Sequence, residues 1–166
     1  MPTNYERAFA ARPDVYAGWR QLLTAIKANM DERRYELVTL AAARRLRSSY
    51  CCLAHGSVLR ELGEPVREIA LDHRSAGLDD VDVAVMDLAE RAVEDASAIT
   101  NGDRQRLRDL GLSDDEIKDV ILAASARCFF AKANDAMGVL PDAHFIELEP
   151  ELREVLVVGR PIEGTA

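Results

Sequence analysis

The stretch that decides the fold is residues 36–55, which read ELVTLAAARRLRSSYCCLAH. Its first half is rich in Ala and Leu, both strong helix formers, and predicts a helix that begins near Asp31. The serine pair Ser48-Ser49 follows this helix and can cap the start of another, because a serine hydroxyl accepts a hydrogen bond from a free backbone amide. The stretch therefore predicts two consecutive helices with a boundary at the serines.

The rest of the chain has the same preference for helices. Gly and Pro are rare, and no proline occurs from Val66 to Leu140. We expect helices over residues 13–29, 31–47, 49–62, 65–76, 81–92, 103–110 and 113–137, with stops at Gly63, Gly77 and Gly138. The tail, residues 141–166, mixes Pro, Glu and Gly and predicts loop with one helical turn near residues 151–157. The sequence thus predicts a single all-α domain over residues 1–166.

Composition and charge exclude several classes of protein. The 166 residues are 48% apolar and 30% charged, which is typical of a soluble globular domain. Because 29 acidic residues outnumber 21 basic ones, the net charge of -8 repels phosphate backbones and anionic lipid surfaces, so nucleic acid and membrane partners are not expected. Without an apolar leader or spanning segment, and with only three cysteines, the sequence predicts a cytoplasmic protein with free thiols.

One set of residues has the spacing of a reactive site. Ser48, Cys51 and His55 are three and four residues apart, so on a helix they stack along one face. The first turn of a helix favours a thiolate, and His55 can accept the proton of Cys51 while Glu36 on the preceding helix orients the imidazole. Spacing alone leaves a structural interpretation open, since a cysteine in an Ala-rich helix is more often an inert core residue.

The same residues resemble a family signature. In the alkylhydroperoxidase D and carboxymuconolactone decarboxylase family a Glu is followed by eleven residues, a Cys, two residues, a second Cys, three residues and a His. Glu36, Cys51 and His55 fall on three of these four positions, and Ser48 stands where the family has its first cysteine. Residues 110–139 are similar to the second half of the peroxidase-related branch, so the resemblance covers most of the chain.

The resemblance implies a fold and an activity. The fold is an alkylhydroperoxidase D-like bundle of about seven helices that forms homo-oligomers. The activity is that of a thiol-dependent, peroxidase-like antioxidant protein that reduces a small peroxide. In it Cys51 is the nucleophile, His55 the base and Glu36 the partner of the base. Ser48 is then a cap or a hydrogen-bond donor to the thiolate. Because the family's first cysteine resolves the oxidised second one, Ser48 predicts a one-cysteine enzyme or one with impaired disulfide cycling.

Several alternatives remain open. An external thiol can reduce Cys51, and Cys52 or Cys128 can act as the resolving thiol. The family's other activity implies a decarboxylase or isomerase for a carboxylate substrate, in which Glu36 and His55 move protons without a thiol. A third alternative is a non-catalytic oligomeric relic. No cofactor is expected, and no metal site either, since the cysteines lack zinc spacing and the remaining histidines, His73 and His144, stand alone.

Overall fold

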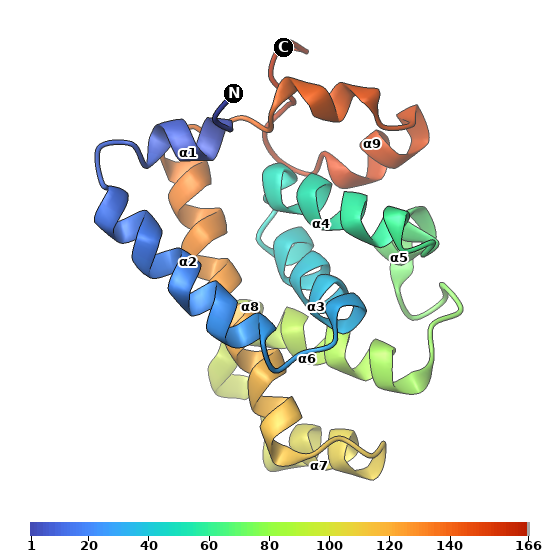
Figure 1. The fold of residues 1–166 in the computed structure, drawn as a ribbon. Coiled ribbons are helices and arrows are strands. Elements are labelled where there is room, and N and C mark those ends of the chain that lie inside the picture. Colours follow the sequence, from blue (N-terminus) through green and yellow to red (C-terminus); the bar gives the residue numbers. More distant parts are fainter. Residues whose placement is uncertain (166) are drawn as a thin grey trace.

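The computed structural model describes residues 1–165 and is built from helices (Figure 1). Its α-helices are α1 (Asn4–Ala8), α2 (Pro13–Lys27), α3 (Glu32–Arg45), α4 (Ser49–Glu61), α5 (Val66–Asp72), α6 (Asp80–Asp95), α7 (Asn101–Asp109), α8 (Asp114–Ala136) and α9 (Pro150–Leu156). Two 3-10 helices cover Ala96–Ala98 and Ala143–Glu147. The predicted all-α fold is confirmed. The short α1 is an addition to the prediction, and α9 corresponds to the helical turn expected in the tail.

The helix boundaries follow from local chemistry. At the start of α8 the Ser113 hydroxyl accepts a hydrogen bond from the Glu116 amide, and the Glu116 carboxylate accepts one from the Ser113 amide. Gly63, Gly77 and Gly138 have φ values of 85°, 80° and 79°, in the left-handed region where glycine is favoured. These glycines are the stops that the sequence predicted.

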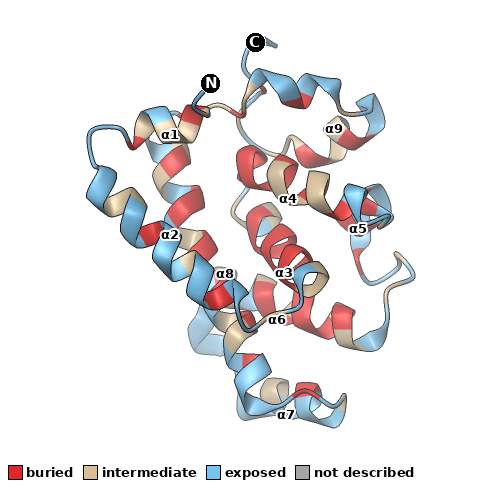
Figure 2. Cartoon of the chain, in the orientation of Figure 1, coloured by how far each residue is buried: buried red, intermediate tan, exposed pale blue. Residues whose placement is uncertain are grey.

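Helix α3 lies at the centre of the molecule. It packs against α4, α6 and α8, and every residue from Tyr35 to Ala43 is buried. Figure 2 shows the middle of this helix in the colour of buried residues. A helix that is buried all round needs apolar side chains on every face, which explains the Ala and Leu of the stretch quoted above. The buried Glu36 in this helix, with 2% of its surface exposed, is therefore an exception that needs a reason.

Helices α1 and α2 form an outer wall alongside α8 (Figure 1). Only Trp19 and Ile26 of α2 are buried, and the Trp19 ring stacks on Phe130 of α8 with centroids 4.9 Å apart. The start of α1 is attached to the far end of the chain, because the Asn4 amide donates a 2.8 Å hydrogen bond to Asp142. The outer wall is thus held at both ends, and a cavity lies behind it.

The tail packs on the helical core. Helix α9 lies against α4 and α5, and Leu156 is fully buried. Beyond it, the Gly159 amide donates a 2.7 Å hydrogen bond to the Ser49 hydroxyl at the start of α4. A Cβ atom at Gly159 would lie 2.1 Å from the Arg47 carbonyl oxygen, so this close approach requires glycine. The described residues contain no helix with the length and apolar character needed to cross a bilayer.

Candidate active site

A cavity of about 360 Å³ lies between the outer wall and helices α4 and α8. Cys51 and His55 of α4 both line it. Five aromatic side chains form much of the remaining wall, namely Tyr5, Tyr16, Trp19, Tyr50 and Phe130. Three basic side chains also line the cavity, and these are Arg20, Lys27 and Arg127. No Asp or Glu is among the described residues of this wall. In a chain of net charge -8, this cavity is a local concentration of positive charge.

Cys51 is the third residue of α4 and is 1% exposed. Its Sγ lies 3.8 Å from Nη1 of Arg127, which comes from α8. Among the described residues no hydrogen bond joins Cys51 to His55, so the polar neighbour of the sulfur is a guanidinium and not the imidazole. Both the helix start and the guanidinium favour a negatively charged sulfur.

Arg127 is a functional candidate that sequence reasoning missed. It is 4% exposed, and its Nη2 donates a 3.1 Å hydrogen bond to the Tyr35 hydroxyl. The guanidinium carbon lies 5.6 Å from the ring centroid of Trp19 and 5.8 Å from that of Phe130. Burial lowers the pKa of Arg127, but attraction to Cys51 and Tyr35 outweighs it and the pKa is raised. The available signal was one arginine in an otherwise apolar part of a long helix.

Glu36 and His55 form the pair that the sequence predicted. Nδ1 of His55 contacts the Glu36 carboxylate, whose other oxygen lies 3.5 Å from Nζ of Lys27. Burial lowers the pKa of His55, and the positive charge of Arg127 lowers it further. Burial raises the pKa of Glu36, but its contacts with His55 and Lys27 outweigh that effect and the pKa is lowered.

These directions define the protonation state of the pair. At neutral pH His55 is neutral and Glu36 is ionised, so Nδ1–H donates to the carboxylate. Nε2 is then the nitrogen free to exchange protons with a molecule in the cavity. Glu36 is thereby explained as the buried carboxylate that fixes the tautomer of His55.

Ser48 does not make the contacts expected of it. It occupies the N-cap position of α4, but its side chain accepts no capping hydrogen bond, and its buried Oγ has no hydrogen-bond partner among the described residues. Its ψ of 97° also differs from the 161° of Ser113, which does cap its helix. The group that Ser48 influences is Asp135 of α8. Burial raises the pKa of this carboxyl, and Ser48 partly offsets the rise.

The other two cysteines lie outside the cavity wall. Cys52 is fully buried, and burial together with the neighbouring Cys51 raises its pKa far above the ordinary value. Cys128 is partly exposed, and burial raises its pKa as well. All three cysteines are free thiols. Only Cys51 combines access to the cavity with a neighbouring cation.

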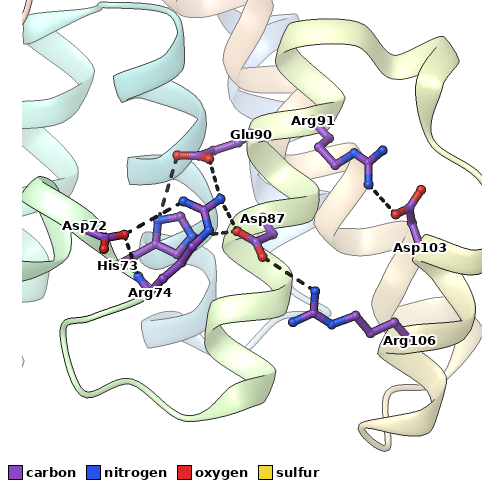
Figure 3. Close-up of polar contacts among 8 residues, drawn as sticks. All are labelled: Asp72, His73, Arg74, Asp87, Glu90, Arg91, Asp103 and Arg106. Carbon is purple, nitrogen blue, oxygen red and sulfur yellow. Dashed lines mark hydrogen bonds and ion pairs between the residues drawn. The ribbon is translucent and has the colours of Figure 1, made fainter.

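A larger cavity, of about 430 Å³, lies between α6 and α7 and is lined by ion pairs (Figure 3). Contrary to the sequence expectation, His73 does not stand alone. Its Nε2 is 3.0 Å from Asp87 and its Nδ1 is 3.9 Å from Glu90. These three side chains are metal-ligating types, but Arg74 contacts both carboxylates and supplies the positive charge itself. Because the described wall holds no nucleophile, we place the candidate site at the smaller cavity.

The fold and this site define a class of protein. Residues 13–95 match the family model described as the carboxymuconolactone decarboxylase family, and this match covers half of the chain. The chain therefore belongs to the carboxymuconolactone decarboxylase family, and the resemblance seen in the signature is confirmed. No curated protein matches the sequence.

Two solved structures share the fold. One is an alkylhydroperoxidase AhpD core, an uncharacterised peroxidase-related protein from Ralstonia eutropha JMP134, with a TM-score of 0.80 and 20% identity. The match covers 86% of this chain and 78% of that one. The other is an uncharacterised peroxidase-related protein from Silicibacter sp. TM1040, with a TM-score of 0.79, 20% identity, and coverage of 89% of this chain and 80% of that one. At this level of identity the likeness establishes the alkylhydroperoxidase D-like fold.

Proposed function

We propose that this protein is a thiol-dependent peroxidase that reduces organic hydroperoxides with Cys51 as its nucleophile. The observation that carries the proposal is the convergence of three groups on one cavity. A cysteine at a helix start lies beside a buried guanidinium, and a neutral imidazole held by a carboxylate faces the same space. A thiolate is the reactive form of cysteine, and this environment favours it.

The proposed step conserves atoms and electrons. The Cys51 sulfur attacks the outer oxygen of a hydroperoxide, so an S–O bond forms and the O–O bond breaks. The sulfur is oxidised to a sulfenic acid, and the peroxide is reduced to an alcohol. The thiol proton has already been lost to solvent and His55 is neutral, so the proton that the departing alkoxide takes up comes from water, relayed through Nε2 of His55, whose other nitrogen is held by Glu36.

Turnover then needs a reductant. Because Ser48 replaces the first signature cysteine and Cys52 and Cys128 lie outside the cavity wall, an external thiol is the proposed reductant. One thiol condenses with the sulfenic acid to give a mixed disulfide and water. A second thiol releases Cys51 and leaves as a disulfide with the first. Without a second thiol to form a disulfide with it, the sulfenic acid of Cys51 can be oxidised further by peroxide.

The cavity favours an organic hydroperoxide over hydrogen peroxide. Its volume of about 360 Å³ is within the range of pockets that enclose small organic ligands. The aromatic side chains on its wall, among them Trp19 and Phe130, provide apolar surface for an alkyl or aryl group. The substrate carbon skeleton would lie against this wall with its peroxide group toward Cys51.

Mass spectrometry after exposure to cumene hydroperoxide tests the proposal. With a sulfenic-acid trap present, the adduct is expected on Cys51, and Cys51→Ser should abolish both the adduct and peroxide consumption. Cys52→Ser is the matched control and should retain both. Lactone turnover that survives alkylation of Cys51 would instead support the decarboxylase alternative, and absence of both activities would support a non-catalytic protein.

A further inference from the structure

We propose that Arg127 is a second catalytic residue of this site, which holds Cys51 as a thiolate and stabilises the oxyanion that leaves it. The inference rests on the proposed function in taking Cys51 as the nucleophile. Arg127 lies outside the family signature. It belongs to α8 and is 76 residues further along the chain than Cys51. Its role follows from its position, its isolation from carboxylates and the way it is held.

The guanidinium of Arg127 is a buried cation that needs an anion. Transfer of a charged group from water into the protein interior is costly unless an opposite charge accompanies it. No carboxylate of the described residues forms an ion pair with Arg127, and its Nε has no hydrogen-bond partner. By contrast, Arg74, Arg91 and Arg106 around the larger cavity each contact an acidic group (Figure 3). Glu36 interacts with Arg127 through space, but its carboxylate is already paired with His55 and Lys27. The group in direct contact with Arg127 that balances its charge is therefore of another kind.

Two polar groups contact the guanidinium, and only one of them can carry the negative charge. The Tyr35 hydroxyl accepts a hydrogen bond from Nη2, but burial raises the pKa of Tyr35, so this hydroxyl is neutral at neutral pH. The second group is the Cys51 sulfur, 3.8 Å from Nη1. A cysteine releases its proton more readily than a tyrosine does. The geometry therefore assigns the negative charge to sulfur.

The surroundings of Arg127 hold it ready for this role. The rings of Trp19 and Phe130 pack against the guanidinium, and Tyr35 fixes one of its nitrogens. Tyr35 also reaches the base, because its ring meets the His55 ring edge-on with centroids 6.1 Å apart. During the reaction, negative charge moves from the sulfur to the departing oxygen. A fixed cation that lines the cavity can stabilise both positions without rearrangement.

The test measures the reactivity of Cys51 in the absence of peroxide. Iodoacetamide alkylation of Cys51 is followed by mass spectrometry across a range of pH in the wild type, Arg127→Gln, Arg127→Lys and Arg20→Gln. Loss of a nearby opposite charge changes the ratio of ionised to neutral forms by about 10- to 1000-fold, so Arg127→Gln should slow alkylation by that factor at neutral pH. At high pH, where any thiol ionises, its rate should rejoin that of the wild type.

Two variants separate the contact from the charge of the cavity as a whole. Arg127→Lys keeps the charge and should recover most of the rate. Arg20 also lines the cavity, but the hydrogen-bond partner of the Cys51 sulfur is Arg127, so Arg20→Gln should stay within about twofold of the wild type. Equal rates for wild type and Arg127→Gln at every pH would overturn the proposal. So would an effect of Arg20→Gln as large as that of Arg127→Gln, because any nearby cation would then suffice.

Folding of each variant is checked by circular dichroism. If Arg127→Gln fails to fold, the comparison of Arg127→Met with Arg127→Lys decides the question in the same assay, and equal rates for these two overturn the proposal. The outcome is independent of peroxidase turnover. A slow Arg127→Gln with no sulfenic acid in the wild type would leave intact the role of Arg127 in holding the thiolate, and would remove the proposed peroxidase together with the oxyanion role. Sulfenic acid on Cys51 of the wild type, together with equal alkylation rates in the wild type and Arg127→Gln, would support the peroxidase and overturn the role of Arg127.

Discussion

A double-mutant cycle between Arg127 and Cys51 should reveal the buried ion pair as a coupling in stability. The four proteins are the wild type, Arg127→Met, Cys51→Ser and the double variant. Methionine is flexible and apolar, so it can occupy the space of a side chain that is 4% exposed. Serine keeps a small polar side chain at residue 51 but carries no charge. The free energy of unfolding is measured for each protein in urea by circular dichroism.

The individual effects of Arg127→Met nearly cancel. Removing the guanidinium relieves the desolvation of a buried cation, which amounts to several kcal/mol. Against this, the hydrogen bond to Tyr35 is lost, and a buried hydroxyl without its partner costs about 1–3 kcal/mol. The contacts with Trp19 and Phe130 contribute about 1–2 kcal/mol more. The single variant alone therefore decides little.

The coupling is the informative quantity. At the 3.8 Å that separates Nη1 from Sγ, and with an effective dielectric constant of about 20, the attraction of two unit charges is about 4 kcal/mol. Measured couplings between neighbouring residues reach about 3 kcal/mol, so we expect Arg127→Met to cost about 1–3 kcal/mol more with Cys51 present than in the Cys51→Ser background. Equal costs in both backgrounds, within about 0.5 kcal/mol, would refute the reasoning.

Three further outcomes are expected. Ser48→Cys should form an intramolecular disulfide with Cys51 under mild peroxide, seen as a loss of two hydrogens in the intact mass, whereas a wild-type disulfide would contradict this account of Ser48. Burial lowers the pKa of His55, so below about pH 6.5 the unfolded chain binds more protons than the folded protein. The free energy of unfolding should therefore fall there in the wild type and fall less in His55→Gln, as measured by urea unfolding at two pH values. Helix α8 leaves Leu122 and Phe129 about half exposed, and light scattering should give a mass above the 18.4 kDa monomer.

Features fixed by local sequence were predictable. The helix stops at Gly63 and Gly138 and the capping box at Ser113 depend on residues within one turn of the boundary. The contact between Glu36 and His55 was predictable for a different reason. The two residues lie on consecutive helices, α3 and α4, which pack against each other. Helix ends and contacts between consecutive helices therefore depend on residues that lie close together in the sequence.

Contacts between distant segments were not predictable. The approach of Arg127 to Cys51 depends on how α8 packs on the core, and no pattern of residues within α8 predicts this contact. Ser48 shows the converse limit, because its position at a helix start was correct but its side chain does not make the expected hydrogen bond. His73 likewise meets Asp87 only through the packing of neighbouring segments. Each of these outcomes is decided by tertiary geometry.

In the proposed function, the residues of the core carry out the reaction and the outer wall selects the substrate. Glu36, Cys51 and Arg127 come from α3, α4 and α8, and the central α3 packs against both of the other helices. Fixed separation is what the chemical step needs, since small displacements of reacting groups are costly in rate. The opposite wall comes from α1 and α2, in which only Asn4, Trp19 and Ile26 are buried. Substitutions on that wall, such as at Leu23, should therefore alter which molecule is accepted, whereas substitutions in the core should alter the reaction itself.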